Sequence, residues 1–252
     1  MLYKCESEDF NYIQSVLKSY LPFSGSSKLA VLWMKYQETP GLYKQALVEE
    51  IDNQIRYFGS SNFAYLKRCI DSLDNQYIEP CVSASEVVND VFSKLKVKIK
   101  LGPSSIETRL QRLVSKVVEH ELLKMPPEKL TEAFKSIGMG DADINNLLEK
   151  IQKSGKIAIL PVLIKILGPE ITLNVIQTII VSMLAQITGA EAAKQLMKEV
   201  IRRNPWMNAL GPIVWVLSSS WFAYDMQGPA FRKTIPICLY LGIVSMRKTK
   251  KN

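Results

Sequence analysis

Apolar residues recur at helical spacing along most of the chain, and the stretch before Gly59 shows the pattern clearly. Each apolar position there follows the last by three or four residues, which places the set on one face of a helix. The residues on this face are Tyr43, Leu47, Ile51, Ile55 and Phe58. Because glycine commonly terminates helices, we expect this helix to end at Gly59.

Side chains that cap helix N-termini mark further helices. Ser83 with Glu86, and Ser104 with Glu107, each have the serine-to-glutamate spacing of a capping box. Prolines and glycines delimit two shorter amphipathic helices within residues 126–155. No alternating segment has a clear partner strand. We therefore predict an all-α fold, a multi-helix bundle.

The charge is divided unevenly along the chain. The net charge of +8 lies entirely in residues 156–252, which contain 12 Lys and Arg against 4 Asp and Glu, whereas residues 1–155 contain 20 of each kind. Long uncharged runs also lie in the second part, at 171–190, 204–224 and 234–246. We expect a charge-balanced amphipathic region followed by a basic hydrophobic one, either as two domains or as one continuous bundle.

The basic region begins with a predicted hydrophobic helical hairpin buried in the bundle. Residues 157–167 are apolar except for Lys165, a Gly-Pro-Glu turn follows at 168–170, and the uncharged run 171–190 forms the second arm. Polar residues follow one another along this arm at four-residue steps: Asn174, Thr178, Ser182 and Gln186. A second set has the small-residue spacing that lets helices pack closely: Ala185, Gly189 and Ala193.

Two interpretations of this second arm stay open. Its 20 uncharged residues match the ~20 that a bilayer-spanning helix needs, so Ile180 and Met183 are candidate membrane contacts. A central helix of a soluble bundle has the same composition, and its amides would then bond inside the core.

The C-terminal segment offers aromatic and basic candidates for membrane or partner contact. Amphipathic aromatic rings favour interfaces, and clustered lysines and arginines favour an anionic lipid surface. The candidates are Trp206, Trp215, Trp221, Tyr224, Arg232, Lys233, Arg247 and Lys248. A basic tail that is simply solvated is the alternative for the last of these residues.

Several segments resemble the YaaW family of uncharacterised bacterial proteins. They lie at 49–68, 87–98, 106–114, 211–215 and 225–248, in the same order as in that family. The signature positions are Phe58, Gly59, Asp90, Gly211, Pro212, Gly228, Pro229, Arg232 and Pro236. This chain departs from the family at Ser60, where relatives often have a second glycine. Some members are also faintly similar to the ubiquinol-cytochrome c chaperone family, a likeness that assigns no activity.

The sequence offers no catalytic motif. His120 is the only histidine, four cysteines lack metal-ligand or redox spacing, and no phosphate-binding glycine loop is present. We therefore expect a non-enzymatic protein without cofactor or metal. Its first residues lack the pattern of a secretory signal, which favours the cytoplasm.

These features together favour a cytoplasmic helical protein that associates with a membrane surface or a membrane protein through its C-terminal helices. In the strongest form of this hypothesis, the hairpin is released on a trigger, as in a pore-forming or defence effector. The alternative is a soluble interaction or assembly factor of chaperone type. Homo-oligomers fit either hypothesis, and nucleic acid is not an expected partner because the lysines lack interleaved aromatic residues.

Overall fold

The computed structural model describes most of the chain. Its described residues are 1–18, 27–60, 67–71, 73, 81–97, 104–136, 138–154, 159–188, 196 and 231–247. Every regular element within these ranges is a helix, which confirms the predicted all-α fold.

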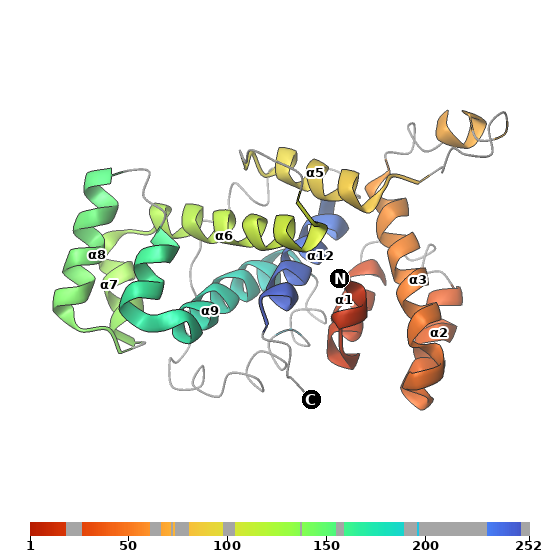
Figure 1. Cartoon of the computed structure of the whole chain (residues 1–252), viewed down its shortest axis with the longest axis horizontal. Helices are drawn as coiled ribbons and strands as arrows, with labels where there is room; N and C mark the ends of the chain where they lie inside the picture. The colour runs from red at the N-terminus through yellow and green to blue at the C-terminus, as the bar shows by residue number, and fades with distance from the viewer. Residues whose placement is uncertain are drawn as a thin grey trace.

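The helices form an elongated assembly (Figure 1). They are η1 (Leu2–Lys4), α1 (Ser7–Lys18), α2 (Ser27–Glu38), α3 (Pro40–Gly59), α5 (Ala84–Lys94), α6 (Ile106–Lys124), α7 (Pro127–Ser136), α8 (Asp141–Ser154), α9 (Ile159–Ile187) and α12 (Phe231–Met246). α2 and α3 lie at one end and α7 and α8 at the other, with α6 and α9 running between them.

α12 lies at the centre of this assembly. Residues 233–245 are buried without interruption, and the helix contacts η1, α1, α3, α5, α6 and α9. A helix that is apolar on all sides must be surrounded by protein or lipid, and here protein surrounds it. The C-terminal region therefore shares one hydrophobic core with the N-terminal region.

The helix ends agree with the expected caps in most places. α3 ends at Gly59, and Ser83 forms the predicted capping box with Glu86, in which each side chain accepts the other residue's backbone N–H. The second predicted box is wrong by one residue: Ser105 caps α6 and accepts the N–H of Thr108 at 3.2 Å. Ser104 and Ser105 are adjacent, and the second of them is the N-cap.

α6 and α12 cross closely at Gly242. A Cβ atom at this position would collide with Cγ2 of Val114 and would lie 2.8 Å from the carbonyl oxygen of Leu110. The second of these atoms belongs to the backbone of α6 and cannot rotate away. Only glycine therefore permits this approach between the two helices.

We predict that Gly242→Ala lowers the free energy of unfolding by about 1–3 kcal/mol, because the added methyl group overpacks the crossing. Urea denaturation followed by circular dichroism would measure the change. Gly41→Ala is the matched control, since nothing lies within 4 Å of a Cβ there and alanine favours helix. Equal stability of the two variants would contradict the packing described.

Candidate functional site

α9 consists of two arms joined at Gly168. This glycine has φ 79° and ψ 166°, a conformation outside the helix, and Pro169 begins the second arm. The turn expected at 168–170 is thus present, and Figure 1 shows the two arms at an angle to each other. The hydroxyl of Thr172 donates to the Gly168 carbonyl at 2.8 Å and satisfies an acceptor at the break.

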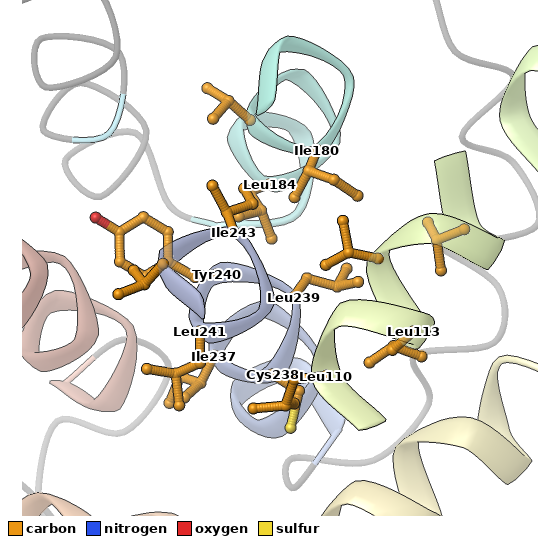
Figure 2. Close-up of a cluster of buried hydrophobic side chains, with 14 of the residues drawn as sticks. Leu110, Leu113, Ile180, Leu184, Ile237, Cys238, Leu239, Tyr240, Leu241 and Ile243 are labelled. Atoms are coloured by element: carbon orange, nitrogen blue, oxygen red, sulfur yellow. The ribbon is translucent and has the colours of Figure 1, made fainter. Parts of the chain in front are cut away.

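The second arm of α9 packs against α12. Ile179, Ile180, Met183 and Leu184 are all buried, and Figure 2 shows Ile180 and Leu184 on the side of α9 that faces α12. Ile180 and Met183, expected as membrane contacts, thus lie in the core rather than at the surface. The period of the apolar residues does not distinguish a lipid-facing side from a core-facing one.

One polar residue of the four-residue series on this arm, Thr178, has a hydrogen-bond partner within the arm. Thr178 is buried, and its hydroxyl donates to the Asn174 carbonyl at 2.8 Å. Ser182 is half-buried, while the side chain of Gln186 lies outside the described residues. The small-residue set lies outside them too: only the backbone of Ala185 is described, and Gly189 and Ala193 are not.

The bend of α9 is the part that faces solvent. Ile164 is 46% exposed and Ile171 is 41% exposed, while Leu167 between them is half-buried. The stretch Ile159–Leu184 is long and apolar enough to cross a membrane by length and composition alone. Of an apolar 18-residue segment within it, 33% is buried. The helical break at Gly168 divides that stretch.

Lys233 lies inside the bundle, although the sequence suggested a surface contact. Its side chain is 1% exposed, its Nζ donates to the carbonyl of Leu17 at the end of α1, and it lies 3.8 Å from the ring centroid of Phe58. Carbonyls in the last turn of a helix lack intrahelical partners and favour a cation. Burial lowers the pKa of Lys233 from 10.5 to about 8.

Arg247 is also an internal partner and not part of a solvated tail. Its guanidinium bonds both oxygens of the Asp9 carboxylate, at 2.8 and 3.0 Å. Tyr240 donates to the same carboxylate at 2.7 Å, and the backbone N–H of Glu6 donates at 2.9 Å. Burial, with the nearby Asp9 charge, raises the pKa of Tyr240 well above 10.0.

These two clusters join α12 to α1 at both ends. Lys233 meets the last turn of α1, whereas Tyr240 and Arg247 meet Asp9 in its first turn. The two helices are therefore antiparallel. We define the Asp9, Tyr240 and Arg247 cluster as the carboxylate clasp. Sequence reasoning missed it because Asp9 lies more than 200 residues from both partners.

Other residues with the family signature have ordinary structural places. Gly59 lies where a Cβ would come within 2.6 Å of Val87, Pro236 is buried in α12, and Arg232 is exposed. Asp90 is exposed on α5, and partial desolvation with the Glu86 charge raises its pKa. The remaining candidates lie outside the described residues: Trp206, Gly211, Pro212, Trp215, Trp221, Tyr224, Gly228, Pro229 and Lys248.

The described residues contain no arrangement typical of a metal centre. No group of three His, Cys, Asp or Glu side chains lies close enough there to hold an ion. His120 is on the surface of α6, with Nδ1 3.6 Å from the Glu121 carboxylate. None of the four cysteines, all within the described residues, forms a disulfide. Burial raises the pKa of Cys5 and Cys238 to about 12, which makes these thiols poor nucleophiles.

The chain is similar to UPF0174 proteins of Helicobacter pylori. One from strain J99 is 24% identical over 213 residues, covering 81% of this chain and 73% of the relative. One from strain 26695 is also 24% identical, over 221 residues that cover 87% of this chain and 95% of the relative. No family model matches the chain, and no solved structure matches it.

We predict that the Lys233 ammonium makes stability depend on pH. Its pKa of about 8 is below 10.5, so between these values the unfolded chain binds more protons than the folded one and the free energy of unfolding rises with pH. Below about pH 8 Lys233 is protonated in both the folded and the unfolded chain, and the free-energy cost of burying its charge is fully present. Urea denaturation from pH 7.5 to 10 should show a steeper rise for the parent than for Lys233→Met. Parallel curves would contradict the assignment.

We predict that Arg247→Gln lowers the free energy of unfolding by about 3 kcal/mol, because it leaves the buried Asp9 carboxylate without its cation. Lys4→Gln is the control: it breaks an exposed ion pair with Glu107 and should cost less than about 1 kcal/mol. Adding Asp9→Asn to Arg247→Gln should restore part of the loss. If the loss of unfolding free energy in the double variant equalled the sum of the losses in the two single variants, the groups would not interact.

Proposed function

We propose that this chain is a non-enzymatic helical protein that associates peripherally with an anionic membrane surface through the bend of α9. The supporting observation is the exposure of Ile164 and Ile171 on the two sides of the Gly168 break, in a stretch that is long and apolar enough to cross a membrane. We place it at the cytoplasmic face of the membrane. We also propose that it belongs to the YaaW family, because it has residues of that family's signature, Phe58 and Pro236 among them.

The charge of the C-terminal part supports an anionic surface. All of the +8 lies in residues 156–252, and each lysine or arginine near an anionic bilayer contributes about 1 kcal/mol. Lys233 and Arg247 do not contribute to this term, because both have partners inside the bundle. Lys165 is exposed within the bend itself. Two half-exposed isoleucines would supply the apolar part of the contact. The predicted binding needs both this apolar contact and the attraction between basic residues and anionic lipid.

Peripheral contact requires no unfolding, whereas release of the hairpin does. Ile179, Ile180 and Leu184 are fully buried, and exposing each such side chain costs about 1.5–3 kcal/mol. With their buried neighbours on the same arm, the cost is on the order of 10 kcal/mol, similar to the whole stability of a typical domain. The packing therefore favours surface contact over triggered insertion as a starting hypothesis.

A soluble interaction or assembly factor remains the second candidate. The observation that favours it is the burial of α12 and of the second arm of α9, because most of the apolar sequence is then used by the core. In that case the α9 bend would contact a protein partner. Membrane binding by the purified chain separates the two candidates.

We predict that the protein floats with liposomes containing anionic lipid, that high salt weakens this binding, and that neutral liposomes bind it less. Ile164→Gln with Ile171→Gln should reduce the floated fraction about tenfold, because the apolar contact area is lost without a change of charge.

Leu42→Gln is the matched control, since Leu42 is an exposed leucine of α3 away from the bend. It should float like the parent chain. Absence of flotation by the folded parent, or equal flotation of the double variant, would overturn the membrane proposal and favour a soluble factor.

A further inference from the structure

A cavity lies where η1, α3, α5, α6 and α12 meet. Its volume is about 630 Å³, within the range of about 300–1,000 Å³ that small-molecule pockets occupy. Its apolar walls come from four helices and include Val48, Val87, Leu110, Ile237 and Leu241. These side chains are buried in the core, so the floor of the cavity is formed by rigid packing and not by loops.

Three carboxylates line this cavity, beside the polar side chains of Tyr3, Asn53 and Ser105. Glu49 and Asp52 come from adjacent turns of α3, and Glu107 comes from the first turn of α6. Among the described residues that line it there is no lysine or arginine. The charged side chains that line the cavity are therefore all acidic, in a chain with a net charge of +8.

The carboxylates have partners outside the cavity, and these interactions are weak. Glu49 accepts from Gln45 at 2.9 Å, Asp52 is 3.9 Å from Arg56, and Glu107 pairs with the half-exposed Lys4. Exposed ion pairs of this kind contribute about 0–1 kcal/mol each. A cation bound in the cavity would keep most of these contacts and add its own charge to them.

We propose that this cavity binds a lipophilic cation, a small molecule with an apolar body and an ammonium group. The apolar body would lie against the half-buried Ala84 and Ile106, with Leu110 beneath them, and the ammonium would face Glu49 and Asp52. An anionic amphiphile of the same length would meet these carboxylates with like charge. A polyamine would leave the apolar walls unfilled, so both halves of the ligand are required.

The proposal is independent of membrane binding, since the cavity is separate from the exposed isoleucines of α9. Isothermal titration calorimetry with decyltrimethylammonium, decyl sulfate and decanol, each below its aggregation concentration, tests it on the full chain. We expect one-to-one binding of decyltrimethylammonium at least about tenfold tighter than that of decyl sulfate. Decanol should bind with intermediate affinity, because it has the same chain without the charge.

Two variants separate the charge from the shape of the cavity. Glu49→Gln with Asp52→Asn should weaken decyltrimethylammonium binding about threefold to tenfold and leave decanol binding unchanged. Ala84→Trp should abolish the binding of all three probes, because Ala84 lines the cavity at the start of α5 and a tryptophan there would fill it.

The control for lost charge is Glu128→Gln with Glu132→Gln, two exposed acids of α7 outside the cavity. It should bind like the parent. No binding of decyltrimethylammonium, equal affinity for decyl sulfate, or unchanged binding by a folded Ala84→Trp would each overturn the proposal.

Discussion

The burial of α12 is the constraint on which the rest of the structure depends. A helix with no exposed face from residue 233 to residue 245 can exist in water only if other helices cover every side of it. α6, α9, α3, α5 and α1 pack against it. Gly242 permits one close approach, where a backbone carbonyl of α6 lies beside α12.

Polar groups determine how the central helix is oriented. An apolar helix has no strong preference for direction or depth in a core, because hydrophobic burial is not directional. Lys233 at one end of α12 bonds Leu17 in the last turn of α1, and Arg247 at the other end bonds Asp9 in the first turn. Since an unpaired buried charge is costly, these contacts fix both the antiparallel direction and the register of α1 and α12.

Much of the fold could be predicted from the sequence, because helix periods, ends and breaks depend on residues that are close together in the chain. The helical period of Tyr43 to Phe58, the end at Gly59, the capping box of Ser83 and the break at Gly168 depend on residues within a few positions of each other. The roles of Lys233 and Arg247 could not be predicted in this way. Both looked like surface cations, and their partners are far away in the chain.

The same limit applies to the candidate sites. Hydropathy identified α9 but could not show that Ile180 faces α12 while Ile164 faces solvent. The cavity was not predicted at all, because its walls come from five elements that only the fold brings together.

A rigid core around α12 and a membrane contact confined to the bend of α9 are the two central expectations. Hydrogen–deuterium exchange, with and without anionic liposomes, tests both parts in one experiment. We predict that lipid slows exchange near residues 164–171, while residues 235–245 of α12 stay protected throughout. Faster exchange in α12 on lipid binding, or no change at the bend in protein that is bound, would contradict it.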